Sequence, residues 1–247
     1  MKVIPILLKK EFLSLKKKYL SFLLVTILFP LFIYLFISLP LSAIVIDLKP
    51  IYPNWSAAGI WAVTSLIFIY IFSFRLYNKT FDNQSMIVLP IPSYYLLLSN
   101  YLFLALIGLF QLSITIFIIG MINNDYIGFL DYMVTIIIVI PVFFIVASIS
   151  LFVHFFIKNK IILPILNIIF FCLVAFGYGS FIPLKYFPPT YIDFIKYFPI
   201  PGMIENFQNI ISGKPIMFSY LILSAFSCFL IFLISIFIVD KKVIKNI

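Results

Sequence analysis

The feature that most constrains this chain is a series of apolar segments longer than the roughly 18 residues that a helix needs to cross a bilayer. Hydrophobic residues make up 64% of the sequence, charged residues make up only 10%, and the mean hydropathy is +1.22. A soluble domain of 247 residues would alternate core-facing and water-facing positions, and this chain does not. It is therefore predicted to be an integral membrane protein.

The apolar segments predict an all-α membrane protein with six transmembrane helices in a single domain, residues 20–247. Barrel strands are excluded because the segments lack the alternation that a polar lumen imposes. The predicted spans are 20–46, 55–74, 93–121, 129–157, 161–181 and 216–239. The first span contains Pro30 and Pro40 and is longer than needed, so a kink or an end is expected near Pro40.

The basic residues predict the orientation, because the cytoplasmic side of a membrane retains them. Six spans put both termini on one side. If that side is the cytosol, only Lys49, Lys185, Lys196 and Lys214 of the 17 basic residues lie on the other. We therefore expect a multi-pass protein of the cytoplasmic membrane with both termini inside. The net charge of +9 follows from this asymmetry and from attraction to lipid headgroups, and it indicates no nucleic-acid partner.

Residues 1–19 are predicted to form an amphipathic helix that lies in the membrane interface. At about 100° per residue, one stripe of the helix is apolar and the opposite face is polar. The stripe holds Ile4, Leu8, Phe12, Leu15 and Tyr19, and the opposite face holds Lys10, Ser14 and Lys17. The alternative is a basic tail that only orients the first span.

Enzymatic chemistry is not indicated. The eight acidic residues are scattered, and the single histidine, His154, lacks an orienting partner in the sequence and is interpreted as a packing residue. No glycine-rich phosphate loop is present, so the chain is not expected to hydrolyse ATP. Cys172 and Cys228 fall within predicted spans and are interpreted as small packing residues. No metal or catalytic residue is therefore assigned.

A few amides lie within the predicted spans: Asn100 and Gln111 in the third, and Asn167 in the fifth. Unpaired amide groups are costly in lipid, so these side chains are expected to face protein or a wet cavity. Hydrogen bonds between helices and a candidate substrate path are the two interpretations. The sequence places no ion pair within the spans, so it does not indicate a proton or ion relay.

The loop between spans two and three carries the most specific signal. Within 78–90, residues 80–89 are predicted to form a short cytoplasmic helix, with Asp82 in its first turn and Pro90 ending it. The apolar side chains of Phe81, Met86 and Leu89 would be exposed beside Arg75 and Lys79. Such a surface is typical of a docking site for another protein, and a helix lying on the membrane is the alternative.

This pattern resembles the ABC-2-type permeases, the membrane subunits of ATP-binding-cassette exporters. The resemblance covers nearly the whole chain: the amino-terminal interfacial helix, six spans, a basic residue and short helix after span two, then Pro-Ile-Pro-Ser and a third span with Gly108 and Gln111. It implies that 78–90 is the coupling helix that contacts a separate ATPase. The coupling residues would be Arg75, Lys79, Phe81, Asp82, Met86 and Leu89.

The segment 176–212 contains a stretch, residues 187–202, that is too apolar for water and too rich in proline to cross a bilayer. Residues 190–198 are predicted to form a short helix, with a capping box from Thr190 to Asp193, an Asp193–Lys196 pair, and Pro199 and Pro201 stopping the helix. The segment resembles the family's re-entrant outer hairpin, and an ordinary surface loop is the alternative. The hairpin residues are Gly177, Gly179, Pro183, Asp193, Lys196, Pro199 and Glu205.

The resemblance implies export, and the short extracellular loops and nearly uncharged spans favour an amphipathic small molecule, drug or peptide as the cargo. Its partners would be two copies of a cytosolic ABC ATPase, a second permease subunit, identical or homologous, and membrane lipids. ATP and Mg²⁺ would be used by the ATPase, and this chain would bind no cofactor. Export of a lipid-linked polysaccharide is one alternative. A membrane immunity or channel protein that works without an ATPase is another.

Overall fold

The computed structural model describes residues 3–45, 51–81, 92–157 and 162–245, and the regular elements in these ranges are helices. Five segments there are long and apolar enough to cross a bilayer. They are Tyr19–Ser42, which comprises α2 and α3, and the helices α4 (Tyr52–Phe81), α6 (Ser93–Asn123), α7 (Phe129–Phe156) and α11 (Phe218–Lys245). The chain is therefore an all-α, multi-pass membrane protein, as its composition predicts.

A separate helix precedes the first span. Helix α1 (Val3–Lys16) is followed by a bend at Lys17 and Lys18, here called the elbow, and then by α2 (Tyr19–Ile33). The half-buried side chains of Ile4, Leu8 and Leu15 lie on one stripe of α1, as predicted. Tyr19 does not belong to that stripe, because it begins α2 and is exposed.

The first span ends close to Pro40, as expected. A π-helical turn, Tyr34–Ser38, links α2 to α3 (Leu39–Ser42), and Pro40 lies in the first turn of α3. Proline has no N–H to donate and its ring crowds the carbonyl four residues earlier, so Pro40 disturbs the regular α-helical hydrogen-bond ladder. The wider π-helical turn accommodates, within the helix, the absence of the hydrogen bond that Pro40 cannot make.

Helix α4 is the central element of the bundle. It packs against α2, α6, α7, α8 (Ile162–Cys172) and α10 (Pro199–Ile211). Small buried residues, among them Ala58 and Ala62, allow its neighbours to approach closely. Two of its buried hydroxyls are satisfied within the helix, since Ser65 and Ser73 donate to the carbonyls of Trp61 and Ile69 at 2.6 Å.

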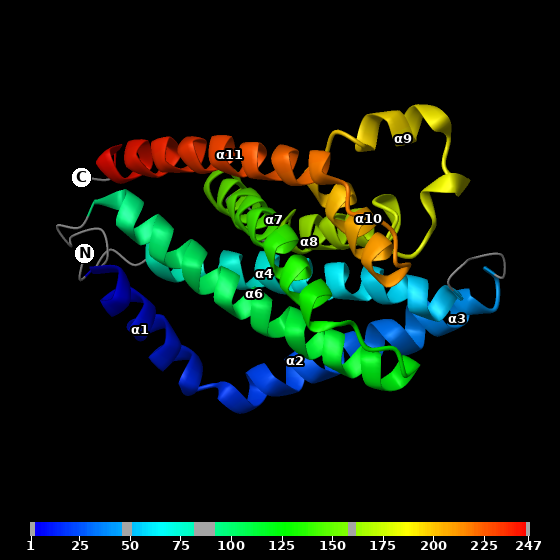
Figure 1. Ribbon diagram of the computed structural model, residues 1–247. Coiled ribbons are helices and arrows are strands. Elements are labelled where there is room, and N and C mark those ends of the chain that lie inside the picture. Colours follow the sequence, from blue (N-terminus) through cyan, green and yellow to red (C-terminus); the bar gives the residue numbers. More distant parts are fainter. Residues whose placement is uncertain (1–2, 46–50, 82–91, 158–161, 246–247) are drawn as a thin grey trace.

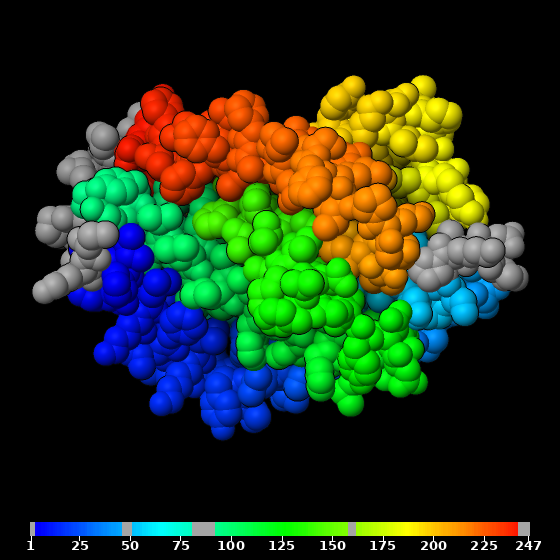
Figure 2. Space-filling model, in the orientation of Figure 1, coloured from blue at the N-terminus to red at the C-terminus, as the bar shows by residue number. Residues whose placement is uncertain are grey.

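From α2 to α7, successive long helices run in opposite directions, whereas α7 and α11 run in the same direction, and the two chain ends lie at the same end of the molecule (Figure 1). The space-filling view places the N-terminal helices along one edge and α11 with the hairpin along the opposite edge (Figure 2). This arrangement needs a return path between α7 and α11. Helix α8 and the π-helical turn Leu173–Gly177 provide it, running back toward the far end of the bundle.

The fifth predicted span is shorter than expected. The sequence predicts a crossing over 161–181, whereas the helix covers Ile162–Gly177, 16 residues that fall below the length of the five long spans. At roughly 1.5 Å per residue this helix spans about 24 Å, less than the hydrocarbon thickness. Gly179, with φ of 85°, ends it in a turn that a residue with a Cβ adopts at a cost.

The hairpin after α8 contains more helix than predicted. A 3₁₀ turn, Leu184–Tyr186, leads to α9 (Pro189–Ile195), close to the predicted helix, and then to α10. The predicted capping box is wrong, because the helix begins at Pro189 and Thr190 makes no capping hydrogen bond. Pro199 was expected only to stop a helix, yet it also starts α10, where its fixed φ and missing N–H suit the first turn.

Candidate functional site

An ion pair ties the N-terminal helix to the end of α4. Lys79 Nζ lies 2.8 Å from Glu11 Oε2, and the glutamate side chain is only 9% exposed while the lysine is 37% exposed. Sixty-eight residues separate the two in sequence. A carboxylate so nearly buried needs a cationic partner, so the pair links α1 firmly to α4 just before residue 82.

Of the predicted coupling residues, Arg75 and Lys79 lie on the last turns of α4 and face α1 and the start of α2. Phe81 is the last residue of α4, and its side chain lies outside the described part of the structure. Asp82, Met86 and Leu89 also lie outside the described residues, as does most of the predicted helix over 78–90. The docking surface therefore stays a prediction.

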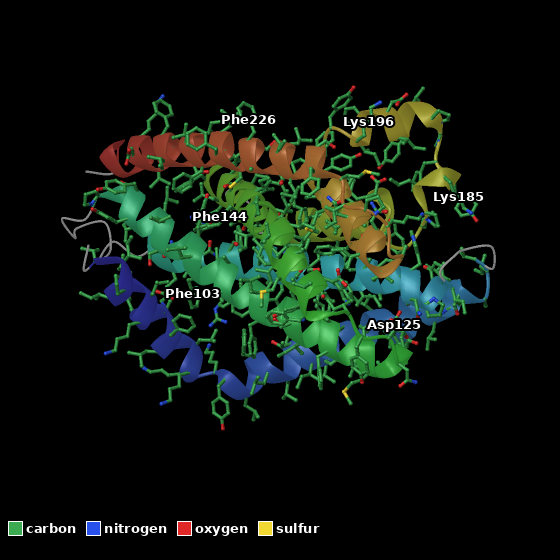
Figure 3. All side chains as sticks on the ribbon, viewed as in Figure 1. Phe103, Asp125, Phe144, Lys185, Lys196 and Phe226 are labelled. Carbon is green, nitrogen blue, oxygen red and sulfur yellow. The ribbon has the colours of Figure 1, made fainter. Side chains whose placement is uncertain are left out.

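Arg75 and Lys79 open onto a cavity of about 330 Å³ that we call the elbow cavity. Its polar lining includes Glu11, Ser14, Lys18 and Ser21 from the elbow region. Its apolar lining is Leu15, Phe22, Val25, Phe68, Ile71, Phe72, Leu76 and Phe103. Phe103, labelled in Figure 3, projects from α6 toward α1, where its ring meets Phe12 edge-on at 5.2 Å. The cavity thus lies between the elbow, α4 and α6.

Glu11 was not among the site residues predicted from the sequence. Its signal was available, because Glu11 lies three residues after Leu8 and four before Leu15, on the apolar stripe of the predicted helix. A single carboxylate on an otherwise apolar face indicates a buried partner. The identity of that partner was not available from periodicity.

The three amides of the candidate substrate path are not brought together. Gln111 is buried, and its Nε2 donates to the Thr26 carbonyl at 3.2 Å and to Thr115 Oγ1 at 3.3 Å. Thr115 in turn bonds Thr64 at 3.1 Å, so this network joins α2, α4 and α6. The structure therefore favours a role for Gln111 in hydrogen bonding between helices over a role in lining a substrate path.

Asn100 and Asn167 lie elsewhere. Asn100 is buried on α6, eleven residues before Gln111 and so roughly 16 Å away along the helix. Its Nδ2 has no hydrogen-bond partner within the described part of the chain. Asn167 is half-buried on α8. None of the three lines the elbow cavity or the smaller cavity described next.

A second cavity, of about 130 Å³, lies near the opposite end of α4. Asn54 Nδ2 donates to Asp125 Oδ2 at 2.9 Å at its margin, and Trp61 also lines it. Asp125 is labelled in Figure 3. No predicted site residue lines this cavity.

The hairpin residues occupy one connected region. Three side chains hold the turn after α8 in place by donating hydrogen bonds to its carbonyls. These bonds run from Tyr191 to Gly177 at 2.9 Å, from Gln208 to Gly179 at 2.8 Å, and from Tyr52 to Phe181 at 2.8 Å. The predicted glycines are thus held through their backbone. Sequence reasoning missed Tyr52, Tyr191 and Gln208, since nothing local distinguishes them from other polar side chains.

Of the remaining predicted hairpin residues, only Asp193 and Lys196 are exposed, and Pro183 is buried. Lys196 Nζ bonds Asp193 Oδ1 at 2.7 Å, as predicted, and this hydrogen bond raises the pKa of the lysine. Lys185 and Lys196 lie at the hairpin end of the molecule in Figure 3. Pro183 precedes the 3₁₀ turn, Pro199 begins α10, and Glu205 is half-buried on α10.

His154 packs among aromatic rings, with ring centroids 5.7 Å from Phe74 and 5.2 Å from Phe155, in keeping with a packing residue. Both cysteines are free thiols.

No protein-family model matches this chain, and no curated protein matches it. Support for a function therefore comes from the geometry of the molecule and from the resemblance of its motifs.

Proposed function

We propose that this chain is the membrane subunit of an ATP-driven exporter of the ABC-2 type. It would move an amphipathic small molecule, drug or peptide out across the cytoplasmic membrane, and a separate cytosolic ATPase would hydrolyse ATP with Mg²⁺. The observation that carries the proposal is the Glu11–Lys79 pair at 2.8 Å, which connects α1 to α4 at the start of the predicted coupling segment, 78–90.

The pair supports the proposal because it would transmit a displacement of α4 to α1. An ATPase that pushes on residues 82–90 would displace the end of α4, and the ion pair would carry that displacement to α1 and the elbow. Coupling between distant sites needs such a contiguous physical connection between rigid elements. Movement of the elbow would then tilt the first span.

A conduit between two copies of the chain, or between this chain and a homologous permease, suits the packing. The centre of the bundle is filled, with α4 buried along most of its length and Gln111 bonded to neighbouring helices. The three amides share no cavity in a single chain, so a large cargo is better accommodated between protomers.

The hairpin would cap the outward side of such a conduit. Helix α10 packs its buried face, including Met203 and Phe207, against α4, α7 and α11. An ordinary surface loop would not bury so much of a 13-residue helix. This packing supports a re-entrant element anchored in the bundle.

The proposal is tested by purifying the chain from its native membrane, identifying an ABC ATPase that copurifies with it, and reconstituting both in proteoliposomes. Lys79→Met should leave the complex intact but lower the amount of cargo moved per ATP hydrolysed, several-fold or more, because α1 is released from α4. Lys196→Met is the matched control, since it breaks an exposed pair at the hairpin, and it should leave the ratio unchanged.

Two results would contradict the proposal. One is transport, or protection of cells, by the chain alone without nucleotide, as the channel or immunity alternative predicts. The other is an unchanged ratio of transport to hydrolysis when Phe81 and Met86 are both replaced by aspartate.

A further inference from the structure

The elbow cavity changes from charged to apolar along its length. On α4, Lys79 and Arg75 lie toward the helix end and Phe72 and Phe68 lie deeper, all on one face at spacings of three or four residues. Because α2 runs in the opposite direction, Lys18 lies at the charged end and Val25 about 10 Å deeper. The two walls therefore share one gradient of polarity.

The charged end carries an excess of positive charge. Lys18, Arg75 and Lys79 face a single carboxylate, Glu11, which is already bound to Lys79. Arg75 forms no ion pair with any residue that the structure describes. Its guanidinium can give the paired hydrogen bonds that phosphate oxygens accept.

The apolar end opens sideways rather than into the core. Val25 and Ile71, which line it, are each 51% exposed. The neighbouring face of α2 is also exposed and apolar, with Leu24 51% and Leu28 45% exposed. In a bilayer this opening faces acyl chains, so a bound molecule can keep its head in the cavity and its tail along α2.

We propose that the elbow cavity binds one anionic phospholipid from the surrounding membrane, with its phosphate among Lys18, Arg75 and Lys79 and its acyl chain along Phe72, Phe68 and Val25. A free phosphate would use the same basic groups. The apolar depth and the lateral opening favour a lipid, since a soluble anion would leave both without a partner. The volume of about 330 Å³ lies at the lower end of the range for ligand pockets, roughly 300–1,000 Å³, which suits a headgroup and the start of a chain.

A lipid bound there would join the same elements as the Glu11–Lys79 pair. Its phosphate would bridge the elbow to the last turns of α4, so the position of α1 would depend on the membrane's anionic lipid. The inference does not rest on the proposed function, because lipid binding needs neither a nucleotide nor a partner protein.

The test is a titration of the purified full-length chain, followed by native mass spectrometry, with dioleoyl phosphatidylglycerol and with dioleoyl phosphatidylcholine. The first phosphatidylglycerol should bind at least about tenfold more tightly than the first phosphatidylcholine. Replacing both Lys18 and Arg75 by glutamine should weaken phosphatidylglycerol binding by roughly fivefold for each basic group removed. Lys9→Gln combined with Lys16→Gln removes two exposed charges from α1 that do not line the cavity, and it should have no such effect.

A second variant keeps every charge and fills the space instead. Ser21→Trp should block the cavity and abolish the preference for phosphatidylglycerol, whereas Leu20→Trp, at an exposed neighbour outside the cavity, should not. The inference is overturned if both charge variants weaken binding equally, if the two lipids bind alike, or if both tryptophan variants behave alike. It is also overturned if millimolar inorganic phosphate displaces the lipid, since the site would then take a soluble anion.

Discussion

Gly59 lies where α4 touches the turn that follows α8. A Cβ at this position would lie 2.1 Å from the backbone oxygen of Ser180. Ser180 is buried and held in place, because its Oγ donates a hydrogen bond to the Val174 carbonyl at 2.6 Å. A backbone atom held in this way cannot give way cheaply. At the scale of single residues, the absence of one side chain therefore permits the contact between α4 and the hairpin.

Gly59→Ala should destabilise the protein by about 1–3 kcal/mol, although alanine is the better helix former by about 1 kcal/mol. Thermal unfolding in detergent measures the change. Gly128→Ala is the control, because the nearest atom to its added Cβ would be Asp131 Oδ2 at 3.4 Å, an ordinary contact. Its cost should be smaller, limited to the lost preference for glycine before a helix. A stabilising Gly59→Ala would show that the turn can move.

Helix α10 shows how a short element can anchor an irregular segment. It begins at Pro199, and its buried residues recur at helical spacing, among them Ile200, Met203, Ile204 and Phe207. Phe207 is fully buried and its ring meets the Trp61 ring of α4 at 6.1 Å. Helix α9 contrasts with it, since Phe194 is 62% exposed. At the scale of elements, α10 packs the hairpin against the bundle far more extensively than α9, which contributes mainly the buried Ile195 and the hydrogen bond of Tyr191.

Phe207→Ala should destabilise the protein by about 3 kcal/mol, because it leaves a cavity beside Trp61. In a Trp55→Phe background, which leaves Trp61 as the only tryptophan, its fluorescence should shift as the ring environment changes. Phe194→Ala should change neither the stability nor the emission. Equal effects of the two substitutions would mean that α10 is not the anchor.

Both chain ends lie at one end of the bundle, and the hairpin lies at the other (Figure 1). Five crossings would put the termini on opposite sides of a membrane, whereas six put them on the same side. At the scale of the whole molecule, the topology thus depends on whether the short helix Ile162–Gly177 counts as a crossing. This short helix runs back toward the hairpin end of the bundle (Figure 1), and that direction favours counting it as a sixth crossing.

Cysteine labelling should confirm six crossings. With Cys172 and Cys228 replaced by alanine, Thr190→Cys should react with a membrane-impermeant maleimide in intact cells. Lys16→Cys and Lys241→Cys should react only after the cells are opened, if both basic ends lie in the cytosol as the charge pattern predicts. All three positions are exposed, so access to each is comparable. Labelling of Lys16→Cys and Lys241→Cys from opposite sides would instead support five crossings.

Much of the secondary structure was predictable, because lipid requires each spanning segment to satisfy its own backbone and so imposes long apolar helices. Local composition and proline account for the bend before Tyr19 and for the span end near Pro40. They also account for the helix predicted over 190–198, which lies close to α9. The start of α10 was missed because Pro199 was considered only as a stop. The short length of α8 was missed because hydropathy continues past the turn at Gly179.

By itself the sequence determined that this is an all-α membrane protein and where most of its helices lie, since hydropathy and helix-breaking residues act locally along the chain. Only the tertiary structure decided that Glu11 meets Lys79, that Gln111 bonds to Thr26, and that the turn after α8 rests on Gly59. Those contacts join segments far apart in sequence. Their partners are selected by packing in three dimensions, which no local periodicity encodes.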